Sequence, residues 1–350
     1  MSTLPVRPLG TTGMDITRVG LGSWVVAGAG WHYSWGSTDD AESVAAIRHA
    51  IESGVNWIDT AAVYGLGHAE EIVAKTLAEL PEADRPYVFT KVGLVWDPAD
   101  PGAVPRRSMR PDSVRREVED SLRRLGVERI DLYQVHWPDN GDALNYGADD
   151  QDAPAAPSAT PLEEYWQVMA DLKAEGKVRA LGLSNHSVDE LTRAEAIAHV
   201  DVIQPPFSAI SRGAAAELAW AAAQGTGAIV YSPMQSGLLS GSFTAERAAA
   251  LGSDDWRASH PDFTTGLTAN LALAEALRPI AARHDATVAE TAVAWTLAWP
   301  GVTGAIVGAR NPRQVDGWIG AADVELTELD LDEIAKAIAR TGAGDGPARP

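Results

Sequence analysis

Trp57-Ile-Asp-Thr-Ala-Ala-Val-Tyr64-Gly-Leu-Gly67 is a short apolar segment that presents an acid and a phenol before it turns at two glycines. Its first half is typical of a buried strand over residues 55–60, and a helical pattern follows over residues 69–80. Side chains at the carboxyl end of such a strand lie where parallel sheets bind their ligands. Asp59 and Tyr64 are therefore candidate site residues; a helix cap and a core tyrosine are the alternatives.

The same alternation of strand and helix continues along the chain. Predicted strands begin near Val19, Val55, Tyr87, Ile130, Val178, Val202, Gly227 and Gly304, and a predicted helix follows each one. Eight such units indicate an α/β fold, a closed (β/α)8 TIM barrel, rather than an open doubly wound sheet. An N-terminal β-hairpin is predicted over residues 6–20. No Ser/Gly-rich linker divides the chain, so we expect a single domain over residues 1–340 and a frayed, flexible tail over residues 341–350.

Three predicted connections are long, over residues 93–109, 137–160 and 233–266. Each follows a strand, so all three lie on the C-terminal face of the barrel, where long loops act as lids or binding loops. The connection over residues 139–160 carries several aspartates among alanines and prolines, which predicts a mobile, solvated acidic flap. After the last strand, one continuous helix is predicted over residues 312–322 and a final helix over residues 328–340.

Composition excludes several classes of protein. The 350 residues are 45% hydrophobic, enough for a large core, and the absence of cysteine excludes disulfides and thiolate sites. The eight histidines show no metal-binding spacing, so no metal is predicted. A net charge of −20 disfavours nucleic acid and anionic membranes as partners. Without a spanning segment or signal pattern the chain is expected to be cytoplasmic, and no apolar stripe decides whether it forms a homo-oligomer.

Two further ionisable residues stand at strand ends. Lys91 ends the strand after that of Asp59, and His136 ends the next one. Taken singly, a snorkelling lysine or a satisfied core histidine is the simpler interpretation. Together, Asp59, Tyr64, Lys91 and His136 converge from three adjacent strands on one end of a barrel, which predicts an active site.

Several motifs in this order resemble the aldo-keto reductase superfamily, in particular its bacterial branch of general-stress and channel β-subunit-like reductases. The motifs are WIDTAAVYGLGHAEEIVAKTL, VFTK, SLRRLGVERIDLYQVHWPD, LGLSNHS, YSPMQSGLLSG and IVGARNPRQV. The resemblance implies a barrel that binds a nicotinamide dinucleotide in extended form and reduces a small-molecule carbonyl. It also implies that Asp59, Tyr64, Lys91 and His136 are the catalytic tetrad.

The chemistry of these four residues is consistent with that role. Hydride addition to a carbonyl develops an alkoxide, which needs a proton donor. We expect Tyr64 to act as the general acid in reduction and the general base in oxidation, with its pKa lowered by the Lys91 ammonium. Asp59 would keep Lys91 charged and aimed, and His136 would orient the carbonyl oxygen.

The cofactor residues follow from the resemblance, because the chain has no Rossmann fingerprint. Ser184, Asn185 and Gln204 match the residues that hold the nicotinamide carboxamide, and Tyr231 matches the aromatic that stacks on the ring. The loop that contacts the pyrophosphate is matched by Ser232, Pro233, Met234, Ser236, Gly237, Leu238 and Ser240. Past the last strand, Gly308, Arg310 and Gln314 open a helix, and Arg310 suits the 2′-phosphate, which favours NADPH/NADP+ over NADH.

One position departs from the pattern of the superfamily. Gly317-Trp318 stands where many relatives carry a Glu-Asn pair that touches adenine, so Trp318 is expected to recognise adenine by stacking. Ordinary loop capping and solvated surface arginines are the alternatives for the cofactor residues.

The substrate side is expected to be an aromatic-walled pocket made by Trp24, Trp96 and Trp137, with Trp31 and Trp35 nearby. Such walls suit sugars and aromatic or terpenoid carbonyls. Two other functions stay open. One is a barrel aldolase in which Lys91 forms a Schiff base, against which its pairing with Asp59 argues. The other is a non-catalytic subunit that binds the dinucleotide to sense redox state.

Overall fold

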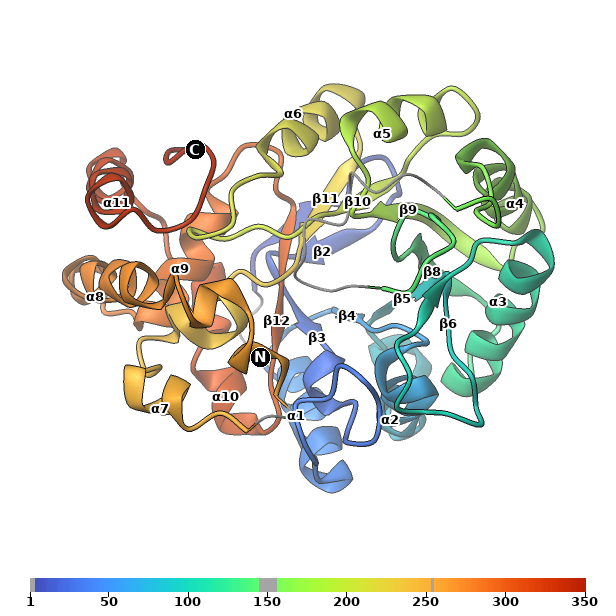
Figure 1. Cartoon of the computed structure of the whole chain (residues 1–350), viewed down its shortest axis with the longest axis horizontal. Helices are drawn as coiled ribbons and strands as arrows, with labels where there is room; N and C mark the ends of the chain where they lie inside the picture. The colour runs from blue at the N-terminus through green and yellow to red at the C-terminus, as the bar shows by residue number, and fades with distance from the viewer. Residues whose placement is uncertain (1–3, 145–155, 253–254) are drawn as a thin grey trace.

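Eight parallel strands close into a barrel at the centre of the computed structural model, which describes residues 4–144, 156–252 and 255–350 (Figure 1). In order around the barrel they are β3 (Val19–Gly22), β4 (Trp57–Asp59), β5 (Tyr87–Val92), β8 (Ile130–Val135), β9 (Val178–Ser184), β10 (Val202–Gln204), β11 (Gly227–Val230) and β12 (Gly304–Gly308). The last strand pairs with the first, Ala305 opposite Val19, so the sheet has no free edge. The predicted α/β TIM barrel is confirmed.

Helices surround the barrel, and their ends follow from local sequence. The helices are α1 (Asp40–Glu52), α2 (His68–Ala78), α3 (Pro111–Leu125), α4 (Leu162–Ala174), α5 (Val188–Glu195), α6 (Ala215–Gln224), α7 (Ala245–Ala249), α8 (Leu267–Arg283), α9 (Val288–Leu297), α10 (Pro312–Asp316) and α11 (Glu328–Thr341). Helix α3 begins with proline at its first position and ends at Gly126, which adopts the left-handed conformation with φ of 66°. Ser187, Thr287 and Thr327 each form a capping box with an acid three residues later.

The single helix predicted over residues 312–322 is wrong. Helix α10 ends at Asp316, Gly317 caps it, and a separate 3-10 turn, η7, covers Ile319–Ala322. Trp318 lies between the two with φ of −137°, outside the helical range, and its side chain is only 2% exposed. Burial of this indole in the core therefore interrupts the helix.

Shorter elements lie in the connections. The other 3-10 turns are η1 (Trp24–Val26), η2 (Tyr64–Gly67), η3 (Glu82–Asp84), η4 (Gln235–Ser240), η5 (Trp256–Ala258) and η6 (Pro261–Phe263). The connection after β5 contains an antiparallel hairpin of β6 (Leu94–Val95) and β7 (Arg106–Arg107). Among the described residues no helix is long and apolar enough to cross a membrane.

The interior of the barrel is filled by an apolar plug. It consists of Leu9, Met14, Ile16, Trp57, Phe89, Leu132, Ala180, Val202, Ile229 and Ile306. Three of these residues come from the predicted N-terminal hairpin, which is confirmed as β1 (Val6–Pro8) and β2 (Asp15–Thr17). A Cβ atom on Gly20 would lie 2.1 Å from the Trp57 ring, so a glycine is required to admit that indole. The hairpin closes the barrel at the N-terminal ends of its strands, and the C-terminal ends are left open to ligands.

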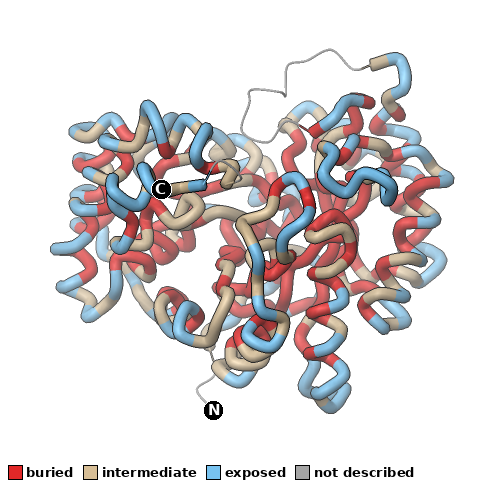
Figure 2. The backbone as a smooth tube through the Cα atoms, turned by 60° about the horizontal axis from the view of Figure 1, so that its bottom comes forward, coloured by how far each residue is buried: buried red, intermediate tan, exposed pale blue. Residues whose placement is uncertain are grey.

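A second, larger core lies between the strands and the surrounding helices, and buried backbone fills the centre of the molecule in Figure 2. The end of the chain is attached to this body. The Arg212 guanidinium donates to the carbonyl oxygens of Ala343 and Gly346, and Ala343 is fully buried. Arg349 pairs with Glu328 and Asp332 of α11. These contacts attach residues 341–350, which were expected to be a flexible tail, to the body of the protein.

The expected acidic flap is only partly described. Asp139 is 9% exposed, and its carboxylate accepts hydrogen bonds from the backbone N–H groups of Met109, Gly141 and Thr160. It is therefore a structural acceptor, and the expectation that it belongs to a solvated flap is wrong. The remainder of that expectation, over residues 145–155, lies outside the described residues.

Candidate active site

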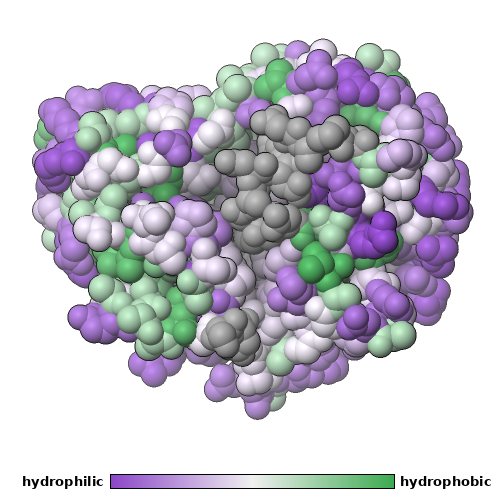
Figure 3. Space-filling view, in the orientation of Figure 1, coloured by the Kyte–Doolittle hydropathy of each residue, from purple (hydrophilic) through white to green (hydrophobic). Residues whose placement is uncertain are grey.

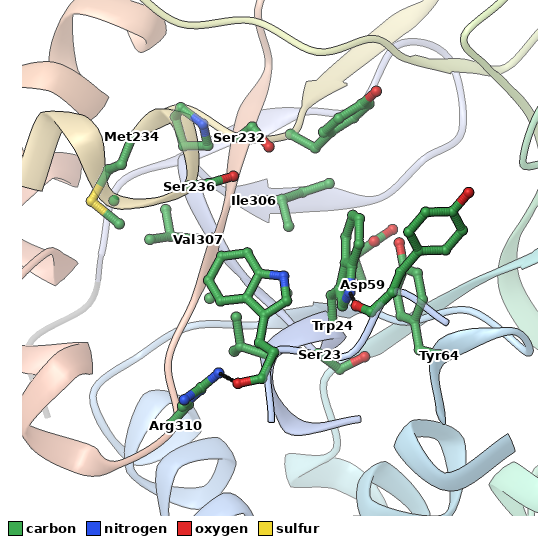
Figure 4. Close-up of a pocket in the computed structure, with 18 of the residues that line it drawn as sticks. Ser23, Trp24, Asp59, Tyr64, Ser232, Met234, Ser236, Ile306, Val307 and Arg310 are labelled. Atoms are coloured by element: carbon green, nitrogen blue, oxygen red, sulfur yellow. Dashed lines mark hydrogen bonds between the residues drawn. The ribbon is translucent and has the colours of Figure 1, made fainter. Parts of the chain in front are cut away.

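A cavity of about 450 Å³ opens at the carboxyl ends of the barrel strands. Figure 4 shows Asp59 and Tyr64 at one end of it, Met234 and Ser236 across from them, and Arg310 at a third corner. The cavity is thus elongated, with the candidate catalytic residues and the candidate phosphate-binding arginine well separated along it. It lies on the face where barrel enzymes place their ligands.

Lys91, Asp59 and Tyr64 form one hydrogen-bonded chain. The Lys91 Nζ donates to Asp59 Oδ1 at 2.5 Å, to the Thr60 carbonyl oxygen at 3.0 Å and to the Tyr64 hydroxyl at 3.3 Å. The lysine side chain is fully buried and that of Asp59 is 3% exposed. Lys91 lies behind the cavity wall, whereas Asp59 and Tyr64 line the cavity. The ammonium is therefore linked to the cavity through Asp59 and through the phenol of Tyr64.

His136 completes the group of four. Its ring lies edge-on to the Tyr64 ring with the centroids 5.6 Å apart, and it lines the same cavity. Burial and the nearby Lys91 charge hold the pKa of His136 well below its ordinary value. The imidazole is therefore neutral near pH 7 and carries a single N–H donor. The structure brings together all four residues predicted from the strand ends.

The expected direction of the Tyr64 pKa is wrong. Burial, and after it the Asp59 charge, raise the pKa of Tyr64 well above 10. Burial also lowers the pKa of Lys91, although Asp59 opposes that effect. The physical reason is that Asp59 and Lys91 form a neutral pair, so the ammonium field at the phenol is largely cancelled while desolvation remains. Tyr64 therefore rests as a neutral phenol.

Two glutamines that support Asp59 were not found as a pair from the sequence. Gln204 Nε2 donates to Asp59 Oδ2 at 2.8 Å, and Gln134 Nε2 donates to the same oxygen at 3.3 Å. Gln204 was predicted as a cofactor residue and lines the cavity, but Gln134 was not singled out. A glutamine within a predicted strand does not stand out in the sequence as a site residue. Its role depends on its side chain pointing into the barrel, which the sequence alone does not show.

The predicted carboxamide site is assembled around Asn185. Its Nδ2 donates to the His136 carbonyl oxygen and to Ser184 Oγ, and its Oδ1 accepts from the Tyr231 hydroxyl at 2.8 Å. Asn185 has φ of 63°, a left-handed conformation that asparagine tolerates better than most residues. Ser184, Asn185, Gln204 and Tyr231 all line the cavity. They present amide and hydroxyl groups on one wall, which fits a ligand that carries an amide.

The loop after β11 lies along the cavity, as the resemblance implied, with one exception. Its lining residues are Ser232, Pro233, Met234, Ser236, Gly237 and Ser240. Leu238, which was also matched to this loop, is fully buried in the core between strands and helices and does not line the cavity. Ser232 and Ser236 have positive φ values of 57° and 51°, which turn this loop tightly over the barrel.

The far end of the cavity is basic. Gly308, Arg310, Gln314 and Trp318 line it as predicted, and so do Arg247 and Arg257 from the long connection after β11. Arg310 Nη2 donates to the Trp35 carbonyl oxygen at 2.8 Å, and the Arg257 guanidinium lies 4.6 Å from the centre of the Trp35 ring. Asp255 pairs with Arg257, which leaves an excess of positive charge in this wall.

Arg247 and Arg257 were missed because they lie in α7 and η5, which are too short to show a periodicity from which to place their side chains. In a chain with a net charge of −20, three guanidiniums on one wall fit an anionic ligand such as a phosphate.

Aromatic residues surround the end of the cavity near Tyr64. Trp24, Trp31, Trp35 and Trp137 line it, and the Trp24 and Tyr64 rings are stacked with centroids 5.6 Å apart and an interplanar angle of 16°. Trp96, which was also predicted as a substrate contact, packs beside the cluster and does not line the cavity.

The outer surface differs from the cavity. On the face seen in Figure 3, hydrophilic side chains dominate the rim, and the apolar side chains of the described residues form small separate patches. Among residues 4–144, 156–252 and 255–350, no group of three or more metal-ligating side chains lies together. The elongated cavity is thus the feature of the described chain that combines charged, amide and aromatic groups.

Comparisons with known proteins agree with this geometry. The sequence model of the Aldo/keto reductase family matches residues 18–339. An aldo-keto reductase of Bacillus subtilis is 34% identical over 94% of this chain and 92% of its own length. An NADH-specific methylglyoxal reductase of Escherichia coli is 32% identical over 95% of this chain and 99% of its own length. The solved structure of a glycerol dehydrogenase of Gluconobacter oxydans superposes with a TM-score of 0.82 at 34% identity, over 99% of this chain and 98% of that one.

Proposed function

Because this chain belongs to the aldo/keto reductase family of oxidoreductases, we propose that it reduces an aldehyde or ketone to an alcohol with NADPH. Tyr64 is the general acid of reduction and the general base of oxidation. The observation that carries the proposal is the buried chain from Asp59 through Lys91 to the Tyr64 hydroxyl, which ends at the cavity.

The four residues divide the work of proton transfer. When bound, the reduced nicotinamide supplies a hydride to the carbonyl carbon, and the developing alkoxide needs a proton. The raised pKa of Tyr64 keeps its proton in place until then. As the phenol gives up that proton, Lys91 Nζ at 3.3 Å stabilises the phenolate, and Asp59 holds the ammonium in position. Neutral His136 donates its N–H to the carbonyl oxygen and orients it.

The walls of the cavity suit a nicotinamide dinucleotide. Ser184, Asn185 and Gln204 would hold the carboxamide, because the Gln204 side-chain oxygen can accept from its NH2 group and the polar groups of Ser184 and Asn185 line the same wall. Tyr231 would stack on the nicotinamide ring, and Gly308, Arg310 and Gln314 would meet phosphate at the start of α10.

The choice between NADPH and NADH is a proposal of its own. The basic wall of Arg247, Arg257 and Arg310 supports a cofactor with an additional phosphate. The name of the E. coli relative states NADH specificity for that protein, so the preference needs direct measurement here. Trp318 would cover adenine by stacking.

We further propose that the substrate is a small carbonyl compound held between Trp24 and Trp137, such as a sugar or another small carbonyl. The names of two relatives refer to methylglyoxal and to glycerol, both small oxygenated molecules.

A single domain over residues 1–340 and a cytoplasmic location are also proposed. A homo-oligomer is compatible with the chain.

The test is a panel of aldehydes and ketones in which oxidation of NADPH and of NADH is followed by absorbance, with wild type and Tyr64→Phe. Multiple turnovers with NADPH that Tyr64→Phe abolishes would support the proposal. A Tyr64→Phe variant with near-normal turnover would refute the role of the phenol. Borohydride trapping of a substrate on Lys91 would establish an aldolase instead, and tight dinucleotide binding without turnover would establish a sensing subunit.

A further inference from the structure

Gln134 is a buried amide directly beneath the candidate tetrad. It lies on β8 two residues before His136 and is not exposed at all. Its Nε2 donates to Asp59 Oδ2 at 3.3 Å, and its Oε1 accepts from Gln204 Nε2 at 3.1 Å. Burying an amide is costly unless its hydrogen bonds are made, and here donor and acceptor are both used within the site.

The barrel makes room for this side chain. A Cβ atom on Gly182 of the neighbouring strand β9 would lie 2.7 Å from Gln134 Cγ and 3.3 Å from its Oε1. Gly182 therefore leaves the space that the amide occupies. One residue earlier, Tyr133 points outward into the core between strands and helices, so the two neighbours face opposite sides of β8. The inward amide is a specific feature of the barrel interior.

Gln134 fixes the orientation of Gln204. Gln204 Nε2 donates both to Asp59 Oδ2, at 2.8 Å, and to Gln134 Oε1, so both hydrogens of that nitrogen are used. The side-chain oxygen of Gln204, Oε1, is then the polar atom of its amide that is left to face the cavity. Without an acceptor at position 134, the Gln204 amide would lose one of the two bonds that define its orientation.

The Asp59 carboxylate bonds both to Lys91 and to the two glutamines. Its Oδ1 accepts from Lys91, and its Oδ2 accepts from Gln204 and Gln134. Donors to Oδ2 draw negative charge away from Oδ1 and so limit how strongly Asp59 holds the lysine proton. Lys91 can then contribute its remaining hydrogen to the Tyr64 oxygen.

We propose that Gln134 is a positioning residue that joins the carboxamide side of the cavity, through Gln204, to the tetrad, through Asp59, in one rigid hydrogen-bonded unit. The inference rests on the proposed function, because it concerns how that site is held. Loss of Gln134 disturbs the proton donor and the cofactor wall together, although it touches neither the substrate nor the cofactor.

The test compares Gln134→Leu with the neighbouring control Tyr133→Phe. Tyr133 is buried on the same strand, its hydroxyl has no hydrogen-bond partner in the described structure, and it faces away from the tetrad. Three quantities are measured on the full chain: kcat against pH for alcohol oxidation, the Kd of NADP+ by calorimetry, and the thermal unfolding temperature. A second variant, Gly182→Ala, displaces the Gln134 side chain without removing it.

For Gln134→Leu we expect kcat to fall by roughly ten- to a hundredfold, as for small misplacements of catalytic groups. The limb of the pH profile that reports Tyr64 should move to higher pH, because the lysine stabilises the phenolate less. NADP+ binding should weaken by about three- to tenfold, the effect of one hydrogen bond. Gly182→Ala should change all three quantities in the same direction, and Tyr133→Phe should leave them at wild-type values.

The outcomes separate this inference from the proposed function. If Tyr64→Phe is inactive while Gln134→Leu and Gly182→Ala keep the wild-type pH profile and NADP+ affinity, the inference is overturned and the function stands. If Tyr64→Phe remains active, the function itself fails. If Gln134→Leu does not fold, Gly182→Ala decides by the same two readouts.

Discussion

The Lys91 ammonium lies 2.5 Å from Oδ1 of Asp59, and neither side chain is more than 3% exposed. Two opposite charges inside a barrel stabilise each other only as a pair, because each alone would be desolvated without compensation. The same pair holds Tyr64, the proposed proton donor, in place. Stability and the proposed proton transfer therefore depend on one contact.

The first prediction concerns this pair. Lys91→Met should lower the free energy of unfolding by about 3–5 kcal/mol, because it leaves the Asp59 carboxylate buried without a partner. The double variant Asp59→Asn/Lys91→Met should recover part of that loss, because it removes both charges. Urea unfolding of the two single variants and the double variant gives the coupling energy. A double variant whose loss equals the sum of the single losses would show that the charges do not interact.

The second prediction concerns the phenol. Tyr64→Phe should reduce kcat for carbonyl reduction on the order of 10²- to 10⁴-fold, the usual contribution of a general acid. The Kd of NADP+ should stay near its wild-type value, because the ring still packs against Trp24. Steady-state kinetics and calorimetry on the same preparation check both points.

The third prediction concerns cofactor selectivity. Arg310→Ala should weaken NADP+ binding by roughly tenfold to a hundredfold, the loss of one charge-assisted hydrogen bond, and should leave NAD+ binding almost unchanged. Arg313→Ala is the matched control, because Arg313 lies three residues further along the chain, in α10, but is exposed and does not line the cavity. Equal losses for NADP+ and NAD+ would instead place Arg310 at a phosphate that both cofactors share.

The fourth prediction separates two tryptophans. Trp24→Ala should raise KM for carbonyl substrates by roughly tenfold, because it removes the ring stacked on Tyr64 and an aromatic contact of about 1 kcal/mol in addition to buried area. Trp96→Ala should leave KM unchanged, because Trp96 does not line the cavity. The measurement is the KM of the Trp24→Ala and Trp96→Ala variants for each compound of the carbonyl panel, compared with that of wild type.

The fifth prediction concerns pH. Burial raises the pKa of Glu117 from 4.5 to about 7, although the Gly93 N–H and the Ser113 hydroxyl donate to its carboxylate. The folded chain therefore holds this proton more tightly than the unfolded chain does. Ionising the buried Glu117 carboxyl lowers the free energy of unfolding. This loss is absent below pH 4.5, grows as the pH rises to 7, and reaches its full value of about 3 kcal/mol above that.

Glu117→Gln removes this titration. Its free energy of unfolding should exceed that of wild type by an increment that is larger at pH 8 than at pH 5. Urea unfolding at the two pH values checks this, and an equal difference at both would mean that Glu117 keeps an ordinary pKa.

The fold was predictable because its signals are local. Strands β9 and β10 begin at Val178 and Val202, where their starts were predicted, and helix α3 ends at Gly126. These segments are marked by apolar runs and by residues such as glycine that stop a helix. The break at Trp318 was missed, because a helical pattern does not reveal which indole the core will bury.

The candidate site was predictable only in part. Strand ends were sufficient to bring together Asp59, Lys91 and His136, since the carboxyl ends of parallel strands meet on one face. The direction of the Tyr64 pKa required the burial and the Asp59–Lys91 distance, which the sequence does not give. The position of Arg257 also could not be predicted, because it depends on the fold of an irregular loop over the cavity.

The N-terminal hairpin has a practical consequence for protein engineering. The family comparison begins at residue 18, yet Leu9, Met14 and Ile16 from the hairpin pack against Trp57 inside the barrel. A protein truncated at residue 18 would lose the hairpin residues of the apolar plug. Solvent would then reach the Trp57 indole from that end of the barrel. Chimeras and circular permutants should therefore retain the hairpin with the strands it closes, and the bounds of the family model are a poor guide to where this protein can be cut.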